Sequence, residues 1–521
     1  MSNLGTVEKA YHESVMTHFE NKTNATFSER IEALIHEFLS TDRITSELNN
    51  DELNKIFSQV SIPEEGLEES DYLQGMTEHV IGHTINTGSP YFIGHMTTLL
   101  PSFMRPISKL IATMNQNVVK VETSKSLTFY EKQALAMLHK AVYNQNDDYY
   151  KTVLSDHSSP LGLITSGGTL ANIAALQCAR NHSLAPFADI EQEGFFAALN
   201  KAGFTQSVVI GSSLAHYSIE KSMGLLGLGK QNLLSIPVDK NQKIDLMALR
   251  ETLVNCANQR IHVSAIVGVA GSTECGSFDP LSEMADLAEE FGVYFHVDAA
   301  WGGPLVFSDQ HRNLLSGVER ADSVTIDGHK QLYLPMGIGI VLFKNHETGR
   351  LITNEANYII RAASPDLGRM GVEGSRPANV CYLQAALCLI GKKGYAHLLD
   401  NSIKTAHQMA SDIQSSLDFE LLNEPQANIF LYRFIPEAYR GLTQYSVDDN
   451  QEIDRYNIQL QELQLSRGAT FVSRTLFKID SEQSVVGLRV VIANPLTTVM
   501  HCRAVLEDQR NIVRSLESSQ A

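Results

Sequence analysis

The sequence predicts an α/β protein with a largely parallel sheet, preceded by a helical arm and followed by a smaller α+β domain. Three observations support this fold class. Strand-like and helix-like segments alternate from about residue 150 onward, which is typical of a wound sheet. The first ~90 residues carry a helical pattern, and the last ~140 mix strand-like runs with long helices. The length of 521 residues leaves room for two to four domains of ~100–200 residues each.

Composition narrows the class of function. Hydrophobic residues make up 43% and charged residues 19%, so the chain can bury a core. The 41 basic and 59 acidic residues give a net charge of −18, which disfavours nucleic acid and anionic membranes as partners. The six cysteines form no CxxC pair, the N-terminus lacks a secretory pattern, and no apolar run reaches the ~18–20 residues that span a bilayer. We therefore expect a reduced, cytoplasmic protein.

An apolar stripe at helical spacing predicts a helix in the N-terminal arm, formed by Ile31, Leu34, Ile35, Phe38 and Leu39. We expect this stripe to pack on a larger body or on a second subunit, because an apolar face is stable only when it is buried. Gly374 and Pro377 follow the wound region and indicate a domain boundary there, because glycine and proline commonly interrupt helices and strands. The expected units are an arm over residues 1–105, a large domain over 106–378 and a small α+β domain over 379–521.

The elements of the two domains are expected in the following order. Large-domain strands lie at 161–164, 207–211, 264–270, 293–297, 323–326 and 337–343, with helices at 170–180 and 281–291 between some of them. Small-domain strands lie at 428–434, 470–473 and 486–492, with helices at 446–466 and 496–517. Wound sheets bind ligands beyond the carboxyl ends of their strands, so the residues at those ends are the candidates for chemistry.

The first two strand ends offer a phosphate site and an aromatic-stacking group. The segment 165–169 (TSGGT) is a glycine-rich turn before a helix, whose free N–H groups and hydroxyls suit a phosphate. A plain strand-to-helix turn fits it equally, and no GKS or GKT follows that would make it a P-loop. His216, in SSLAHYS after the next strand, is able to stack on an aromatic ligand or to act as a base. A helix cap or a partly buried histidine is the simpler interpretation.

The next two strand ends carry a carboxylate and an amine. Asp298, in HVDAAWGG, ends a buried strand, where it needs a cation or hydrogen-bond donors, and a purely structural aspartate meets that condition too. His296 lies two residues earlier on the same strand face, but no further ligands follow at suitable spacing, so we expect no metal. Lys330, in DGHK, would be partly desolvated at its strand end, which makes an amine nucleophilic, although most lysines are solvated surface residues.

Together the four strand ends match the needs of one ligand, pyridoxal 5′-phosphate. Its phosphate needs the glycine-rich turn at 165–169, and its ring needs a stacking face. Its pyridinium nitrogen needs an anion, and its aldehyde needs a lysine. The stretches GLITSGGTLAN, SSLAHYS, HVDAAWGG and DGHK, in this order and spacing, resemble the group II pyridoxal-phosphate-dependent amino-acid decarboxylases, over roughly residues 85–510. Within that family the chain is most similar to the bacterial aspartate 1-decarboxylase type.

The resemblance implies fold type I of the pyridoxal-phosphate enzymes, as a homodimer with active sites at the subunit interface. It implies that Lys330 bonds to the cofactor aldehyde and that Asp298 faces the ring nitrogen. It places His216 and Ala300 on opposite faces of the ring. The further cofactor contacts that it implies are Ser166, Gly167, Thr273, His329 and Ser375, of which the last reaches the phosphate of the neighbouring subunit.

Three residues are implied in substrate binding. Arg489, in GLRVVIANP, resembles an arginine that receives the substrate α-carboxylate in family members. His95 and Asn117 lie in stretches that match the family's substrate pocket more loosely. Each of these roles has an alternative. Arg489 also fits a surface arginine, and His95 and Asn117 also fit structural packing. Ser375, implied above in phosphate binding, also fits a helix cap.

The reaction that the resemblance implies is α-decarboxylation of an acidic L-amino acid. We expect L-aspartate, giving β-alanine for pantothenate synthesis, ahead of glutamate, giving 4-aminobutyrate. The two substrates differ by one methylene, worth ~1–3 kcal/mol in a pocket, which sequence does not resolve. A transaminase, aldolase or desulfurase of the same fold would also use Lys330 and Asp298. A non-catalytic dimeric scaffold is the last alternative, which an intact Lys330 disfavours.

The sequence leaves open which group delivers the proton that replaces CO2 at Cα. In many members of the family, a tyrosine on a mobile loop of the partner subunit delivers it. The corresponding segment here is 354–373, and Tyr358, early in that segment, is its only tyrosine. The candidates are therefore Tyr358, His216 and Lys330.

Overall fold

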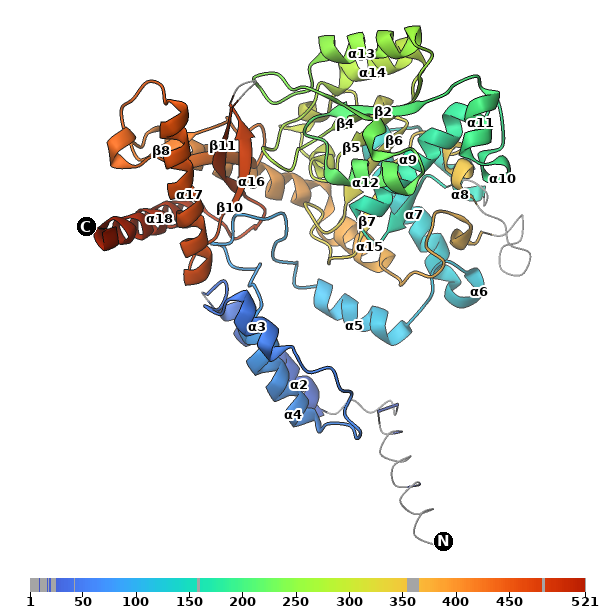
Figure 1. The fold of residues 1–521 in the computed structure, drawn as a ribbon. Coiled ribbons are helices and arrows are strands. Elements are labelled where there is room, and N and C mark those ends of the chain that lie inside the picture. Colours follow the sequence, from blue (N-terminus) through green and yellow to red (C-terminus); the bar gives the residue numbers. More distant parts are fainter. Residues whose placement is uncertain are drawn as a thin grey trace.

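The computed structural model describes residues 25–41, 43–156, 160–353, 365–479 and 483–520, together with residues 9, 16, 18 and 19. Two sheets organise this part of the chain, one of seven strands and one of four (Figure 1). The blue N-terminal helices α2 to α4 project away from the body that contains both sheets (Figure 1). Within the described ranges, no helix combines the length and the apolar character that crossing a lipid bilayer requires.

The seven-stranded sheet has the order β1-β7-β6-β5-β4-β2-β3. Its strands are β1 (Gly162–Thr165), β2 (Ser207–Ser212), β3 (Leu233–Ile236), β4 (His262–Val269), β5 (Phe295–Asp298), β6 (Ser323–Asp327) and β7 (Gly339–Phe343). The neighbours from β3 to β6 pair in parallel, whereas β7 runs antiparallel to both β1 and β6. The prediction of a wound, largely parallel α/β sheet is confirmed.

Helices cover both faces of this sheet, because successive strand residues point to opposite sides. Val209 and Val267 pack in one core cluster with residues of α9 and α12, while Ile210 and Ile266 pack in another with residues of α13 and α14. The helices are α7 (Ser126–Tyr143), α8 (Asp147–Ser155), α9 (Gly168–Leu184), α10 (Ile190–Glu193), α11 (Phe195–Lys201), α12 (Tyr217–Leu225), α13 (Leu246–Asn258), α14 (Leu281–Phe291) and α15 (Val380–Leu389). Strands buried on both faces explain the continuous apolar runs in the sequence.

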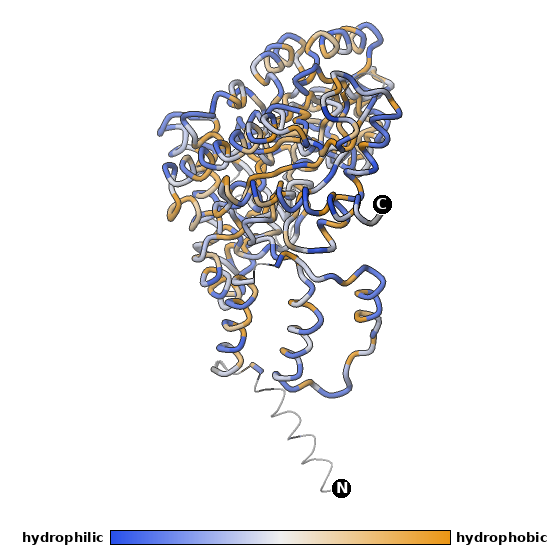
Figure 2. Tube along the Cα trace, turned by 90° about the vertical axis from the view of Figure 1, so that its left-hand side faces the viewer, coloured by the Kyte–Doolittle hydropathy of each residue, from blue (hydrophilic) through white to orange (hydrophobic). Residues whose placement is uncertain are grey.

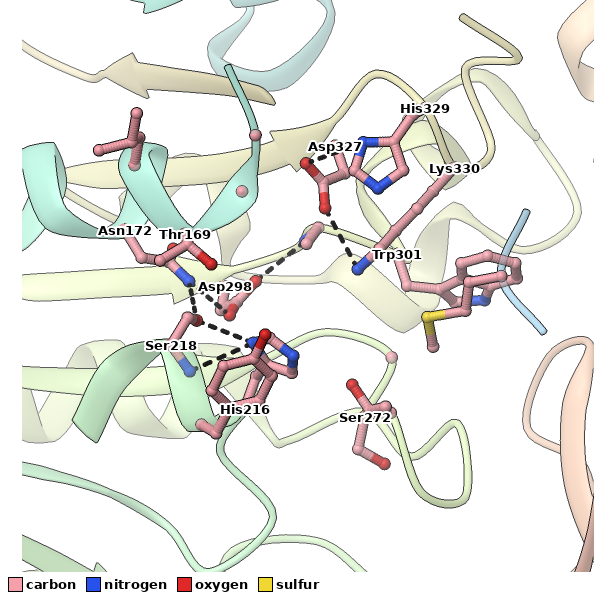
Figure 3. A pocket seen from close by; sticks show the side chains of 18 of the residues that line it. Thr169, Asn172, His216, Ser218, Ser272, Asp298, Trp301, Asp327, His329 and Lys330 are labelled. Atoms are coloured by element: carbon pink, nitrogen blue, oxygen red, sulfur yellow. Dashed lines mark hydrogen bonds and ion pairs between the residues drawn. The ribbon is translucent and has the colours of Figure 1, made fainter. Parts of the chain in front are cut away.

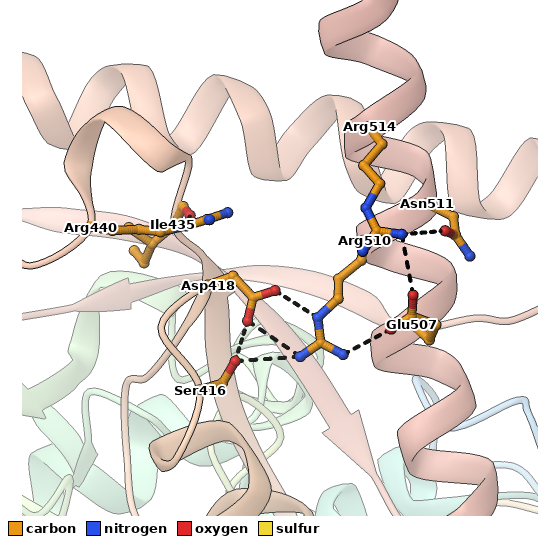
Figure 4. A network of polar contacts seen from close by, with 8 residues as sticks. All are labelled: Ser416, Asp418, Ile435, Arg440, Glu507, Arg510, Asn511 and Arg514. Carbon is orange, nitrogen blue, oxygen red and sulfur yellow. Dashed lines mark hydrogen bonds and ion pairs between the residues drawn. The ribbon is translucent and has the colours of Figure 1, made fainter.

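The small sheet is antiparallel, with the order β10-β11-β9-β8. Its elements are β8 (Phe419–Leu421), β9 (Ile429–Phe434), β10 (Ser473–Lys478) and β11 (Ser484–Val491), with helices α16 (Gly391–Gln414), α17 (Val447–Arg467) and α18 (Val499–Gln520). Arg510 of α18 forms an ion pair with Asp418, just before β8, over 2.6 Å between Nε and Oδ2 (Figure 4). Glu507 of the same helix contacts this guanidinium at 3.2 Å. The pair with Asp418 ties α18 to the sheet edge by charge, in addition to the apolar contacts of the helix.

Three strands differ from the sequence prediction, and one of them, the short edge strand β8, was not expected. The strand expected at 470–473 is wrong, because β10 begins only at Ser473. Arg474 and Lys478 are exposed on this edge strand, so its apolar pattern is weak, whereas Phe471 belongs to a bridge with Phe92. The strand β3 was not expected, because it is short and mostly half-exposed at the sheet edge.

The expected helical arm is present, with its apolar stripe on α2 (Ala25–Ser40). The elements that follow are α3 (Asn50–Ile56), α4 (Glu69–Gly75), α5 (Met104–Met114) and α6 (Val121–Ser124). Figure 2 shows apolar and polar residues alternating along the projecting arm. Between α4 and α5 the chain crosses the small domain, where Ile93 N–H donates to the carbonyl of Phe471 at 3.0 Å and Val491 N–H donates to Ile93 at 2.7 Å. This crossing carries His95 toward the large sheet.

Candidate active site

The carboxyl ends of β1, β2, β5 and β6 open into one cavity of about 700 Å³ (Figure 3). Strand order explains the meeting, because β4, β5 and β6 are neighbours and α9 returns across them after β1. The sequence-predicted residues that line the cavity are His95, Ser166, Gly167, His216, Thr273, Asp298, Ala300, His329, Lys330 and Arg489. Residues as far apart in the sequence as His95 and Arg489 therefore face a common space.

The glycine-rich turn forms the start of α9. Gly167 occupies the N-cap position without a side-chain cap, so the first N–H groups of the helix are available to a ligand. Gly168 allows a close approach, because a Cβ on it would lie 2.7 Å from Oδ2 of Asp327. Ser166 and Thr169 line the cavity on either side of the two glycines. Unpaired N–H groups, hydroxyls and the positive end of a helix form a site for an anion such as phosphate.

Asp298 is the last residue of β5 and is 6% exposed. Its Oδ2 accepts a hydrogen bond from Nδ2 of Asn172 at 2.9 Å, and its Oδ1 accepts one from the N–H of Ala300 at 3.1 Å. A carboxylate has about four acceptor positions, so these two bonds leave capacity toward the cavity. The carboxylate is therefore fixed in place yet able to bind one more donor.

Lys330 follows β6 and approaches a second carboxylate. Its Nζ lies 3.3 Å from Oδ2 of Asp327, the last residue of β6. Oδ1 of Asp327 receives no hydrogen bond from the residues that the structure describes, and Nδ1 of His329 lies 3.7 Å away from it. The side chain of Lys330 is thus held at the cavity wall by an ion pair with a buried aspartate.

His216 caps the N-terminus of α12. Its Nδ1 accepts a hydrogen bond from the N–H of Ser218 at 3.3 Å and lies 2.9 Å from the Oγ of the same serine. Burial lowers the pKa of His216, and the nearby charge of Asp298 opposes that shift. The sequence left open whether His216 is a cap or a residue of the site, and it occupies both positions.

Arg489 is held by three different segments of the chain. Its Nη1 donates to the carbonyl of Thr273 at 2.7 Å, its Nε to Oγ of Ser473 at 2.9 Å and its Nη2 to the carbonyl of Gly94 at 3.3 Å. Burial lowers the pKa of the neighbouring His95, and the positive charges of Arg489 and Lys330 lower it further. The cavity therefore has a cationic end, formed by the small domain and the crossing segment.

Two predicted residues do not reach this cavity. Nδ2 of Asn117 lies 3.3 Å from Oγ of Ser375, and Oδ1 of Asn117 accepts the N–H of Arg376 at 3.1 Å. Neither Asn117 nor Ser375 lines the cavity that contains Lys330 within this chain. The role of Asn117 in substrate binding therefore stays a prediction. Tyr358 lies outside the described residues.

The sequence analysis did not identify the polar residues that contact Asp298, His216 and Lys330, which are Asn172, Ser218 and Asp327. Asn172 touches both Asp298 and Ser218, at 2.9 Å each. A signal was present, because Asn172 lies one helical turn after Gly168 on the same face of α9. Asp327 was visible as well, since it is a second carboxylate at the end of a buried strand.

The residues present fit pyridoxal 5′-phosphate. The uncapped start of α9 suits its phosphate, and the spare acceptor capacity of Asp298 suits a protonated ring nitrogen. Lys330 supplies an amine in the same cavity, and a volume of about 700 Å³ accommodates a cofactor together with a small substrate. No group of three or more metal-ligating side chains occurs among the described residues.

Comparison with known proteins places this geometry in context. Residues 53–435 match the family of the pyridoxal-dependent decarboxylase conserved domain. The aspartate 1-decarboxylase of Aliivibrio fischeri is 39% identical over 495 residues, which cover 93% of this chain and 90% of that protein. The L-2,4-diaminobutyrate decarboxylase of Acinetobacter baumannii is 26% identical over 456 residues, covering 85% and 83% of the two chains.

Solved structures share the fold along nearly the whole chain. Oryza sativa TDC with PLP and tryptamine has a TM-score of 0.82 at 19% identity, covering 95% of this chain and 99% of its own. Mouse CSAD has a TM-score of 0.81 at 22% identity, covering 94% and 99%. The fold class expected from the sequence is confirmed by these likenesses.

Proposed function

This chain belongs to the family of pyridoxal-dependent decarboxylases, and from that premise we propose that it removes the α-carboxylate of L-aspartate, yielding β-alanine and CO2. Pyridoxal 5′-phosphate is its cofactor. The observation that carries the proposal is that Lys330, Asp298 and the uncapped glycine turn face a single cavity. The coarser activity, decarboxylation of an amino acid, follows from the family. The choice of substrate is our proposal.

Each of these groups has a separate task. Bound pyridoxal phosphate supplies a sink for the electrons of the breaking bond between Cα and the carboxylate. Lys330 would provide the amine that holds the cofactor covalently. Asp298 would accept a hydrogen bond from the protonated ring nitrogen, and its negative charge would keep that nitrogen protonated. The N–H groups at the start of α9 would hold the phosphate.

The cationic end of the cavity supports an acidic substrate. Arg489 brings a permanent positive charge to this end of the cavity in a protein whose net charge is −18. Arg489 has five N–H donors, of which three are used by backbone and hydroxyl acceptors, so two remain for a carboxylate. We propose that Arg489 receives a substrate carboxylate and that its position selects which bond is cleaved. The similarity to an aspartate 1-decarboxylase also favours aspartate.

For the proton that replaces CO2 at Cα we propose Lys330. Its Nζ lies 3.3 Å from Oδ2 of Asp327 at the cavity wall, and this carboxylate would stabilise the protonated amine whenever Lys330 is not bonded to the cofactor. Such a positioned cation is a competent general acid. Lys330 would then act twice, first in holding the cofactor and later in returning a proton.

We further propose that the enzyme is a homodimer in which each cavity receives residues from the partner. Asn117 and Ser375 form a polar pair outside this chain's own cavity, which is where a residue that serves the other subunit would lie. The arm and the adjoining body also line an apolar groove of about 850 Å³, which includes Leu34, Ile35 and Phe38. The lining of this groove is mostly apolar, and we propose that a second copy of the chain covers it.

The test is an assay of CO2 release and amine product with aspartate, glutamate, 2,4-diaminobutyrate, tyrosine and cysteine sulfinate. We expect the highest kcat/KM with aspartate and β-alanine as its product. Lys330→Ala should abolish turnover. A higher kcat/KM for another substrate would overturn the assignment of aspartate. Ketoacid formation in place of CO2 would indicate a transaminase.

A further inference from the structure

A continuous chain of hydrogen bonds runs beneath the cavity and joins His216 to Asp298 (Figure 3). Asn172 of α9 is its branch point, since Nδ2 contacts Oδ2 of Asp298 and Oγ of Ser218, at 2.9 Å each. Oγ of Ser218 continues to Nδ1 of His216 at 2.9 Å. On the other side, Oδ1 of Asn172 lies 3.2 Å from Nε2 of His296. Thus one strand, β5, and two helices, α9 and α12, meet at one amide.

Two points of this chain have a fixed direction. The N–H of Ser218 can only donate, so Nδ1 of His216, 3.3 Å away, must be an acceptor without hydrogen. The carboxylate of Asp298 accepts, so the atom of Asn172 that faces it is the amide nitrogen. Both constraints follow from groups of fixed character, because a backbone N–H only donates and a carboxylate only accepts.

The remaining directions follow from these two. With its nitrogen on Asp298 and Ser218, Asn172 turns its oxygen toward His296, so Nε2 of His296 must carry hydrogen. His296 is fully buried, and burial lowers its pKa, so its ring is neutral and Nδ1 is bare. Nδ1 then accepts the hydroxyl of Ser323 at 2.9 Å rather than donating to the carbonyl at 3.2 Å.

The hydroxyl of Ser218 completes the sequence. Its Oγ accepts from Asn172, so its own hydrogen is free to donate to Nδ1 of His216. His216 thereby receives two donors on one nitrogen and keeps its single ring hydrogen on Nε2. That Nε2 makes no hydrogen bond to any residue within the described ranges, and His216 lines the cavity.

We propose that Asn172 is a positioning residue: through a one-directional chain from Ser323 by way of His296, Asn172 and Ser218, it fixes His216 as the neutral tautomer with hydrogen on Nε2. The same amide holds Asp298, so the two side chains that face the cofactor are aligned by one residue. This inference rests on the proposed site, because it concerns His216 and Asp298 as cofactor-facing groups.

The tautomer limits what His216 is able to do. A proton added at Nδ1 would face the N–H of Ser218, so the charged ring is disfavoured, and Nε2 already carries its hydrogen. His216 is therefore neither a base nor the acid that protonates Cα. It donates one hydrogen bond from Nε2 to an acceptor in the cavity, such as a carboxylate. Of the two described candidates for the Cα proton, this leaves Lys330.

The direct test is the tautomer of His216 in the full-length, cofactor-free protein. We would label histidine with 15N, assign the signal by its loss in His216→Gln, and follow the nitrogen shifts by NMR from pH 6 to pH 8. The expected result is hydrogen on Nε2 and a bare Nδ1 throughout. Hydrogen on Nδ1, or a charged ring at pH 7, would overturn the proposal.

Variants then test whether the chain causes the tautomer. Ser218→Ala removes the hydroxyl donor, and we expect a second tautomer of His216 to become populated. Ser222→Ala is the matched control, because Ser222 is a buried serine of the same helix that bonds only to the carbonyl of Ser218. This control should leave the spectrum of His216 unchanged. Equal spectra for both alanine variants would contradict the proposal.

Asn172→Leu removes both branches at once. We expect mixed tautomers of His216 together with a roughly tenfold weaker affinity for pyridoxal phosphate, measured by absorbance titration, because Asp298 loses a charged hydrogen bond. An unchanged affinity for pyridoxal phosphate together with a single tautomer of His216 would contradict the role of Asn172. If the protein showed the expected tautomer but decarboxylated no acidic amino acid, the proposed function would fall while the chain would stand.

Discussion

Single residues at this site act through where they place charge. Asp298 and Asp327 are the carboxylates among the described cavity residues, and Asp327 pairs with Lys330 at 3.3 Å. This leaves Asp298, whose carboxylate is fixed by Asn172 and Ala300, as the partner for a ring nitrogen. For Asp298→Asn we expect kcat/KM to fall by roughly 100-fold or more, because an amide cannot keep the ring nitrogen protonated. Steady-state assays with circular dichroism as a fold check measure this.

A suitable control for that variant is Asp279→Asn. Asp279 is also a buried carboxylate, bonded to the N–H groups of Ile244 and Val269, but it lies outside the cavity. Activity close to that of the parent is expected from it. Equal losses in the two variants would mean that removing any buried carboxylate is enough, and Asp298 would lose its special role.

Arg489 acts through geometry as well as charge. For Arg489→Lys we expect KM for aspartate to rise roughly 10- to 100-fold, because a lysine keeps the charge but not three fixed donors and two free ones. Arg474→Lys is the matched control on the neighbouring strand β10, where Arg474 pairs with Glu462 on the far side of the sheet. An unchanged KM in Arg489→Lys would remove Arg489 from substrate binding.

At the scale of elements, one crossing segment connects the arm to the small sheet. A Cβ on Gly94 would lie 2.3 Å from the nitrogen of Ser473 and 2.6 Å from the carbonyl carbon of Val472, so only glycine fits against this backbone. For Gly94→Ala we expect a loss of about 1–3 kcal/mol in the free energy of unfolding and a displaced His95, with reduced kcat/KM. Urea unfolding and kinetics measure both effects.

The comparison variant is Gly75→Ala near the end of helix α4, where an added Cβ meets no atom within 4 Å. Alanine favours helix over glycine by up to about 1 kcal/mol, so this change should be neutral or stabilising. If Gly94→Ala unfolded at the same urea concentration as Gly75→Ala, the close contact of Gly94 with the backbone of Val472 and Ser473 would not contribute to the free energy of unfolding.

A buried histidine connects α7, α8 and the sheet. Nε2 of His139 lies 3.0 Å from the carbonyl of Phe343 in β7, and Nδ1 lies 2.8 Å from the hydroxyl of Tyr150. Burial lowers the pKa of His139 from 6.5 to about 4. The unfolded chain therefore binds a proton at higher pH than the folded one, and this part of the stability is present above pH 6.5.

Acidification should remove that contribution as the pH falls from 6.5 to about 4, by about 3 kcal/mol. In His139→Gln, whose amide is able to donate to Phe343 but does not titrate, this part of the pH dependence should vanish. Urea unfolding at a series of pH values gives the slope. An identical slope in the parent and the variant would exclude His139 as its source.

At the scale of the whole molecule, the question is whether one chain completes its own site. Lys330 lies in the cavity, but Ser375 and Asn117 lie together outside it. If Ser375 serves the partner, Lys330→Ala and Ser375→Asp should each be inactive alone but restore activity when the subunits are mixed. Random exchange gives about half heterodimers with one intact site each, so about a quarter of parent activity is expected.

Activity measured after joint refolding or co-expression of the two variants decides this point. Separate refolding followed by mixing without subunit exchange is the control and should stay inactive. If both residues serve the same chain, no intact site can arise from the mixture. Absence of recovery with heterodimers present would therefore contradict the shared site.

The sequence by itself determined the fold class and the nature of the chemistry. Buried strands read as continuous apolar runs, and the turn at Gly167, the carboxylate of Asp298 and the amine of Lys330 each follow such a run directly. The order of strands and polar residues along the chain is enough to predict the site, because the carboxyl ends of parallel strands meet at one edge of a sheet.

Only the tertiary structure decided which distant groups meet. The contacts of Arg489 with Thr273 and Gly94, and the exclusion of Asn117 from the cavity, depend on how the arm and the small sheet pack on the large one. The role of Asn172 depends on a single amide that touches two helices and a strand. Such contacts have no period in the sequence, because packing between elements brings them together.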